Sequence, residues 1–251
     1  MRKLGLIGGM SWVSTRAYYE HLNRIVQQRA SVPGSSAALL IESLDFGTLR
    51  AMAESGNWSA VGGVLADSAK RLEQAGAGAL IMCSNSAYAQ YETVASKVSI
   101  PVLHIADAVG EKMAADGVTS AALLGTRPVM TESFYRRRLA AFGVELLPPE
   151  LGYIDALDRI IFKELTLGKF TRDAERTLKT MITELAKAGA RAVVLACTEL
   201  DAVVDVDANV LPIYDSTRLH ADKAAEWVLG EREVPAVFTL SASEAPISRR
   251  A

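Results

Sequence analysis

A pattern of twelve residues that occurs twice constrains the fold of this chain more than any other feature. Residues 75–86 and 188–199 each begin with an Ala-Gly pair typical of a helix end, continue through a short apolar run, and finish with a cysteine and polar residues. Such a run predicts a buried parallel strand. The glycine-to-cysteine spacing is 83 − 76 = 7 in one copy and 197 − 189 = 8 in the other. We therefore expect two similar halves, each placing one thiol, Cys83 or Cys197, at the carboxyl end of a strand.

Strand-like and helix-like segments alternate along the rest of the chain, which favours a parallel or mostly parallel sheet. Strands are expected at residues 3–7, 38–44, 101–104, 121–124, 144–147, 192–196 and 210–214, in addition to the run before Cys83. Helices are expected at residues 58–75, 107–116, 153–167, 171–188 and 217–229. Ligands bind such sheets beyond the carboxyl ends of the strands, where both cysteines fall.

The chain is expected to form two similar doubly wound, mostly parallel-sheet α/β domains that face each other across an active-site cleft. The first domain comprises residues 1–106 and 215–251, and the second comprises residues 107–214. The last helix would return to the first domain, and residues 234–251 would form a loosely held tail. A cleft between two domains is the usual place for a small-molecule site.

Local signals predict how the segments near the strand ends begin. A double glycine after the first strand predicts a tight turn into a helix capped by Ser11 or Ser14. Asn85 or Ser86 is expected to cap the next helix after Cys83, and Thr131 to cap a later one. Backbone N–H groups at such helix starts can hold an anion.

Arg50 and His104 also stand near strand ends. Arg50 follows the second strand in a segment expected to be a loop at the ligand-binding edge. A guanidinium there can hold a carboxylate through two parallel hydrogen bonds, whereas an isolated Arg is more often simply solvated. His104 is expected to be a core histidine with satisfied hydrogen bonds rather than a catalyst.

Composition excludes several classes of function. The chain has 251 residues, half of them hydrophobic, and a net charge of −2, as in ordinary soluble proteins. The lack of a basic excess argues against a nucleic-acid partner, and no apolar run is long enough for a membrane span. Neither a signal-peptide core nor a cleavage site is visible at the start, so two unpaired thiols in a cytoplasmic, reducing location are expected.

The cysteines have alternative interpretations. One cysteine on an apolar strand is more often a packing residue than a catalyst, but two in matching contexts favour chemistry. Two are too few for a disulfide framework. A metal site is not expected, because there is no Cys-x-x-Cys pair and no histidine near either cysteine.

Two thiols on opposite sides of a cleft suit the inversion of a carbon that carries an acidic hydrogen. One sulfur would remove the proton from one face, and the other would donate a proton to the opposite face. Because the pKa of a thiol falls near a helix N-terminus, we expect both cysteines to form thiolates readily. No lysine context suggests a pyridoxal Schiff base, so the hypothesis is a racemase without a cofactor.

At four places the sequence resembles the aspartate/glutamate racemase family, over essentially the whole chain to about Gly230. The matching motifs are Gly-Leu-Ile-Gly-Gly-Met-Ser-Trp-x-Ser-Thr at 5–15, Met-Cys-Ser-Asn-Ser at 82–86, Leu-Gly-Thr at 124–126 and Ala-Cys-Thr-Glu at 196–199. The resemblance implies racemisation of aspartate or glutamate without pyridoxal phosphate, with Cys83 and Cys197 as bases, in a homodimer. It implies that Arg50 binds the side-chain carboxylate of the substrate. The other implied substrate-binding residues are Met10, Ser84, Asn85, Ser86, Thr126, Thr198 and Glu199.

The chain departs from the family pattern at two positions. Tyr88 stands where many relatives carry a histidine, and Thr166, with Lys163 nearby, stands where some carry a substrate-binding lysine. Two alternative functions remain: a related cysteine-dependent decarboxylase or isomerase of a small carboxylate, and a carboxylate-binding protein without catalysis. The Gly-Gly-Met-Ser-Trp motif argues against the first, and the matched cysteines argue against the second.

Overall fold

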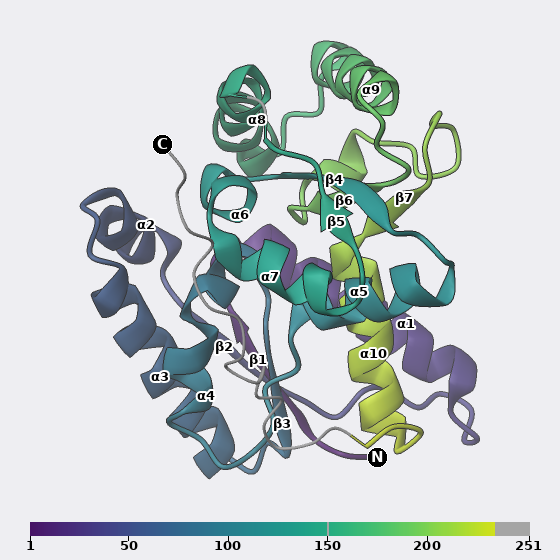
Figure 1. Ribbon diagram of the computed structural model, residues 1–251. Coiled ribbons are helices and arrows are strands. Elements are labelled where there is room, and N and C mark those ends of the chain that lie inside the picture. Colours follow the sequence, from purple (N-terminus) through teal and green to yellow (C-terminus); the bar gives the residue numbers. More distant parts are fainter. Residues whose placement is uncertain (150, 234–251) are drawn as a thin grey trace.

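The computed structural model describes residues 1–149 and 151–233, arranged as two parallel sheets with helices on both faces of each (Figure 1). The predicted tail at 234–251 lies outside the described residues. The strands are β1 (Leu4–Gly8), β2 (Leu39–Ser43), β3 (Ala79–Met82), β4 (Ser120–Gly125), β5 (Glu145–Leu146), β6 (Val193–Ala196) and β7 (Ile213–Asp215). The α/β fold class is confirmed.

Helices connect these strands. They are α1 (Trp12–Arg29), α2 (Phe46–Glu54), α3 (Trp58–Gln74), α4 (Tyr91–Ala95), α5 (Ile105–Ala115), α6 (Arg127–Thr131), α7 (Ser133–Ala141), α8 (Leu151–Lys163), α9 (Arg172–Lys187) and α10 (Ser216–Leu229). Short 3₁₀ turns are η1 (Ser86–Gln90), η2 (Leu165–Leu167) and η3 (Leu200–Ala202). The predicted order of strands and helices is thus largely confirmed.

The first sheet has the order β2-β1-β3, and all its pairs are parallel. Alternate residues of β1 face opposite sides, as the two-residue period of a strand requires. Leu4 and Leu6 belong to a cluster with α1 and α10, whereas Ile7 belongs to one with α3. The sheet is therefore covered on both faces, and β1 is buried along its whole length.

The second sheet has the order β5-β4-β6-β7, again all parallel. Val193 and Leu195 of β6 pack against α8 and α9, while Val194 packs on the side of α5 and α7. Figure 1 shows the latter two helices between the sheets. Parallel sheets buried on both faces explain why the strands before the cysteines read as continuous apolar runs.

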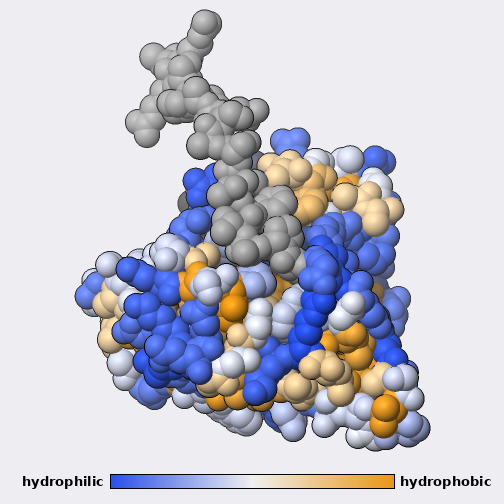
Figure 2. Space-filling model, turned by 90° about the horizontal axis from the view of Figure 1, so that it is seen from below, coloured by the Kyte–Doolittle hydropathy of each residue, from blue (hydrophilic) through white to orange (hydrophobic). Residues whose placement is uncertain are grey.

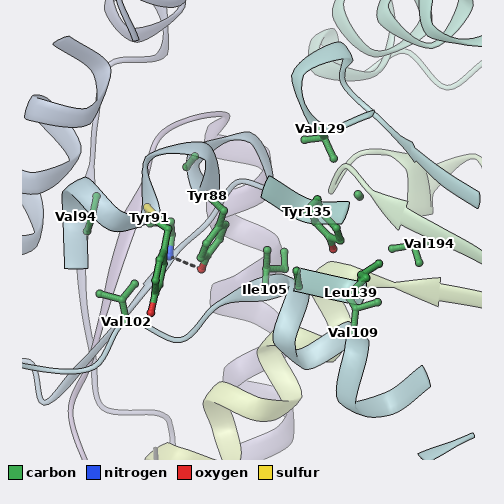
Figure 3. Packing of buried hydrophobic residues seen from close by; sticks show 14 of the residues in the cluster. Tyr88, Tyr91, Val94, Val102, Ile105, Val109, Val129, Tyr135, Leu139 and Val194 are labelled. Carbon is green, nitrogen blue, oxygen red and sulfur yellow. Dashed lines mark hydrogen bonds between the residues drawn. The ribbon is translucent and has the colours of Figure 1, made fainter. Parts of the chain in front are cut away.

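One hydrophobic cluster is shared by the two sheets. It joins Met82 of β3 to Val194 of β6 through side chains of η1, α5 and α7. Figure 3 shows Tyr88 and Tyr91 on one side of this cluster, and Tyr135, Leu139 and Val194 on the other. The sheets are therefore held through a common core rather than by a mobile linker.

Helix α10 ties the C-terminal part of the chain to both sheets. It starts directly after β7, where the Asp215 carboxylate accepts hydrogen bonds from the backbone N–H groups of Thr217 and Arg218. It then packs on α1 and α5 and ends at Gly230 in the left-handed conformation. The last helix returns to the first half of the structure, as expected. The division of the chain at residues 107 and 215 stays a prediction.

Two local predictions are wrong. The segment 101–104 makes one isolated bridge, Leu80 to Val102, because the chain turns into α5 at once with His104 at the N-cap position. Thr131 does not cap the following helix, because its hydroxyl donates to the Arg127 carbonyl at the end of α6. Glu132 occupies the N-cap position of α7 instead.

The face of the molecule at the bottom of Figure 1 mixes hydrophilic and hydrophobic residues over the area that is not drawn in grey (Figure 2). Within residues 1–149 and 151–233, no helix is both long enough and apolar enough to cross a membrane.

Two histidines, His104 and His220, are buried in the fold. Tyr18 donates to Nδ1 of His220 at 2.8 Å, and His220 Nε2 donates to the Leu103 carbonyl at 3.1 Å, so the neutral ring is fully bonded. His104, also buried, accepts a hydrogen bond from the Ala106 N–H group and fills the core role expected for it. Burial lowers the pKa of His220 to about 4 and lowers the pKa of His104 as well.

His220 should make the stability of the fold fall in acid. Its pKa is lower in the folded chain than the ordinary 6.5, so between those values the unfolded chain binds more protons and stability falls as pH falls. From pH 6.5 to 4 the loss should be about 3 kcal/mol. Urea unfolding of His220→Gln at both pH values should show a loss smaller by that amount. Equal losses in the wild type and the variant would contradict the assignment.

Candidate functional site

A pocket of about 440 Å³ lies beyond the carboxyl ends of β1, β3, β4 and β6. Side chains from both halves line it, because α2 of the first half and α8 of the second both contribute to its walls. Of the residues proposed from sequence, the lining includes Met10, Arg50, Ser84, Asn85, Ser86, Thr126, Cys197, Thr198 and Glu199. Cys83 is the proposed residue that does not line it.

The turn after β1 brings Met10 and Ser11 to the pocket. Gly9 has a φ of 86°, and its N–H group donates to the Thr15 hydroxyl at 2.8 Å. Ser11 occupies the N-cap position of α1, but its side chain makes no capping bond and its φ is 100°. Ser14 does not cap either, because its hydroxyl reaches across to Thr198 and Glu199. A side-chain cap at this turn was therefore a wrong prediction.

Gly9 is a specific requirement of this turn. A Cβ at Gly9 would lie 2.0 Å from the Leu44 carbonyl oxygen, at a φ that side chains rarely adopt. Gly9→Ala should therefore destabilise the fold by about 3 kcal/mol or more. Gly34 has a similar φ but nothing within 4 Å, so Gly34→Ala should cost about 1 kcal/mol. Urea unfolding measures both, and equal costs would show that the turn tolerates a side chain.

Cys197 belongs to a polar network that joins the two halves. Its thiol donates to Glu199 Oε2 at 3.2 Å, and the Thr198 hydroxyl donates to the same oxygen at 2.7 Å. Ser14 of α1 donates to Glu199 Oε1 at 3.3 Å. Burial and the neighbouring Glu199 carboxylate raise the pKa of Cys197, whose side chain is only 8% exposed. Cys197 therefore rests as a thiol that is hydrogen-bonded to a carboxylate.

Cys83 lies behind the pocket wall. It is 1% exposed and packs in the cluster formed with α1 and α10, while the three residues after it line the pocket. Burial raises the pKa of this thiol also. The predicted lowering of both thiol pKa values is thus wrong, because only short 3₁₀ turns follow the cysteines and burial outweighs their small dipoles.

Asn85 and Thr126 present polar atoms without partners. Asn85 Oδ1 accepts a hydrogen bond from the Ser216 hydroxyl at 3.2 Å, but its Nδ2 is buried without a partner among the described residues. The same holds for the Thr126 hydroxyl. Asn85 occupies the N-cap position of η1 without a side-chain capping bond, so the predicted cap is wrong there. Unpaired buried donors are costly, and here both stand in the pocket lining, where a ligand could accept from them.

Arg50 lies in a helix rather than in the predicted loop. Asp45 caps α2 by accepting from the Thr48 N–H group at 2.8 Å, which starts the helix before Arg50. Arg50 Nε donates to Glu54 Oε1 at 2.7 Å, one helical turn on. Its guanidinium carbon lies 5.0 Å from the ring centre of Phe162 in α8. Arg50 therefore reaches from α2 of the first half to α8 of the second.

The two departures from the family pattern have different positions. Tyr88 does not line the pocket and lies in the buried cluster instead (Figure 3). Its hydroxyl accepts from the Met82 N–H group at 3.1 Å and donates to the Leu103 carbonyl at 2.9 Å. It thereby holds the strand end just before the cysteine. Thr166 does line the pocket, and its hydroxyl donates to the Phe162 carbonyl at 3.3 Å, whereas Lys163 is not part of the lining.

Sequence reasoning missed much of the lining. The missed apolar residues are Phe46, Leu49, Ala53, Trp58, Val61, Pro128, Ile161 and Phe162, and the missed charged residues are Glu54, Arg127 and Asp158. Arg127 could have been predicted, because it follows Thr126 at a strand end. The lining residues on α2 and α8 could not, because their place in the pocket depends on how the two halves pack together. In the described part of the chain, no group of three or more His, Cys, Asp or Glu side chains could hold a metal ion.

The fold and the pocket define a two-domain α/β protein with a ligand site at the carboxyl ends of parallel strands. The model of the family Asp/Glu/Hydantoin racemase matches residues 7–224. The chain therefore belongs to this family.

Individual relatives agree with this assignment. RacX of Bacillus subtilis (strain 168), a broad specificity amino-acid racemase, is 28% identical over 153 residues. That match spans 60% of this chain and 65% of RacX, which is less than two thirds of the relative's length. A candidate Asp/Glu racemase from Yersinia pestis is 33% identical, with a TM-score of 0.84 over 91% of this chain and 100% of that one. An aspartate racemase homologue from Pyrococcus horikoshii OT3 is 30% identical, with a TM-score of 0.79 over 91% and 99% of the chains.

Proposed function

We propose that this protein racemises a free α-amino acid at the described pocket, with Cys83 and Cys197 as the two bases. The observation that carries the proposal is the pocket lining itself: Cys197 and the residue segment 84–86 that follows Cys83 meet there from different halves of the chain. Family membership and the racemase name of RacX add support.

The proton balance of the reaction is simple. One sulfur, as a thiolate, takes the α-proton, and the other, as a thiol, gives its proton to the opposite face of the planar carbanion. Each turnover exchanges the protonation of the two sulfurs. Before the first turnover, one of the two resting thiols must release its proton to solvent. The substrate's α-ammonium group is a cation, and it favours this loss because a cation lowers the pKa of a neighbouring thiol. Glu199 stabilises the protonated form of Cys197 through the observed hydrogen bond.

The carbanion needs stabilisation of charge as it spreads onto the substrate carboxylate. Asn85 Nδ2 and the Thr126 hydroxyl lie in the lining without a partner among the described residues, and we assign them to this carboxylate. Ser84, Ser86, Met10 and Thr198 complete the amino-acid site that we propose. No cofactor takes part in these steps.

Two substrate classes are candidates. Acidic amino acids, aspartate and glutamate, are supported by Arg50 in the lining, which would bind the side-chain carboxylate. Neutral amino acids are the second class, because apolar side chains of α2, α3 and α8 make up much of the wall and can pack against an aliphatic side chain. The broad specificity of RacX also supports the second class.

A homodimer in the cytoplasm is also proposed, on the support of the resemblance to the family and of two thiols that are unpaired. Light scattering of the purified protein would test the dimer.

Single cysteine variants should separate two-base racemisation from the alternatives. With Cys83→Ser or Cys197→Ser, racemisation should fall by at least about 10³-fold in both directions, because a hydroxyl is a far poorer base than a thiol near neutral pH. The remaining thiol should still exchange the α-hydrogen of one enantiomer, and the two variants should exchange opposite enantiomers. NMR of each pure enantiomer in deuterated water measures both reactions.

The same experiment weighs the alternative functions. A decarboxylase would release carbon dioxide from a malonate-type substrate but would not exchange the α-hydrogen of an amino acid. A binding protein would neither release carbon dioxide nor exchange the α-hydrogen. A variant that racemises at the wild-type rate would make that cysteine structural and overturn the two-base mechanism.

A further inference from the structure

We propose that Glu54 decides which amino-acid side chains the pocket accepts. The Glu54 carboxylate neutralises Arg50, and the site therefore takes a neutral side chain in preference to an acidic one of the same shape. This inference rests on the proposed racemase function and assigns a specificity role to a residue outside the proposed substrate contacts.

The geometry of Arg50 is the first support. A guanidinium recognises a carboxylate best through two parallel N–H bonds. Glu54 already accepts from Nε at 2.7 Å, and Phe162 covers the guanidinium at 5.0 Å. A substrate carboxylate must therefore displace Glu54 from the Nε edge or bind beside it, close to a like charge.

The charge balance of the lining is the second support. Arg50 and Arg127 are the cations among the lining residues that the structure describes, and both are paired. Arg127 is held by Asp158 at 3.0 Å and by Asp155 as well. Counting Glu54, Asp158 and Glu199 as carboxylates, the lining carries 2 − 3 = −1. An additional side-chain carboxylate thus meets no uncommitted cation among the described lining residues, whereas an uncharged side chain does not meet this repulsion.

The apolar wall does not decide between charged and neutral side chains, so this choice falls to the residues at its end. Apolar side chains that line the pocket come from α2, α3 and α8 and are Phe46, Leu49, Trp58, Val61, Ile161 and Phe162, the last of which contacts Arg50. Such a wall favours the methylene groups of a side chain whatever its end carries, so it does not by itself select against acids. Selection at the end of the side chain is left to the Arg50–Glu54 pair.

Exposure sets the expected size of the effect. Arg50 and Glu54 are 44% and 63% exposed, so the pair adds little to stability and its removal should leave the fold intact. A like charge a few ångströms from a bound carboxylate costs on the order of a tenfold loss of affinity in this setting. The consequence should therefore appear in substrate preference rather than in unfolding.

Glutamate and glutamine provide a matched pair of substrates, since they differ in charge and hardly in shape. We expect the ratio of kcat/KM for L-glutamate to kcat/KM for L-glutamine to be below one in the wild type and about tenfold higher in Glu54→Gln. In Arg50→Met the ratio should fall below the wild-type value, because Glu54 is then left without its partner. Glu20→Gln is the control, since Glu20 forms an equivalent exposed pair with Arg24 on α1; its ratio should match the wild type.

The outcomes separate this inference from the proposed function. A wild-type protein that exchanges the α-hydrogen of neither glutamate nor glutamine, nor of other amino acids, overturns the racemase proposal and the inference with it. A wild-type protein that racemises these substrates but prefers glutamate, or a ratio that Glu54→Gln leaves unchanged, overturns the role of Glu54 alone.

Discussion

Packing of the two sheets against shared helices fixes the position of every residue in the pocket. Helix α10 begins where β7 of the second sheet ends and packs on α1 beneath the first sheet. At its start the Ser216 hydroxyl donates to Asn85, a lining residue of the first half. Helix α5 packs against α10 and α7 in the same cluster. The pocket therefore has walls from both halves whose separation is set by a buried core.

Within that frame, burial dominates the electrostatics of the site. Both thiols have raised pKa values because they are buried, and Glu199 adds to the effect at Cys197. The resting site thus holds protonated sulfurs, and in its lining Asn85 Nδ2 and the Thr126 hydroxyl find no partner among the described residues. A substrate that brings an ammonium cation and a carboxylate complements both features. The proposed chemistry follows from this match: the ammonium group can lower the pKa of a buried thiol, and the carboxylate can accept from the buried donors.

The sequence was informative wherever a short-range pattern decides the structure. Apolar runs before Cys83 and Cys197 predicted buried parallel strands correctly, because strands covered on both faces need no polar alternation. The loop predicted for Arg50 is wrong because a local helix signal surrounds this residue. Asp45 caps the helix at Thr48, and Arg50 and Glu54 follow one turn apart.

Other features depend on contacts between distant segments, so no local pattern predicts them. The burial of Cys83 follows from α1 and α10 covering the same face of the first sheet, and these helices lie about 200 residues apart in the chain. Tyr88 could not be assigned to the core from its position after the cysteine motif. Its hydroxyl reaches back to Met82, which requires the exact turn of η1.

The central claim is that Cys83 and Cys197 act on opposite faces of one carbon, and a crystal structure with a bound amino acid tests it most directly. The account predicts that Cys83, which packs behind the pocket wall in the free protein, comes within about 3–3.5 Å of the α-carbon, with Cys197 at a similar distance on the other face. The two sulfurs would then lie about 7 Å apart. An amino acid bound in the pocket with Cys83 still covered by α1 and α10 and out of reach of the α-carbon would contradict it.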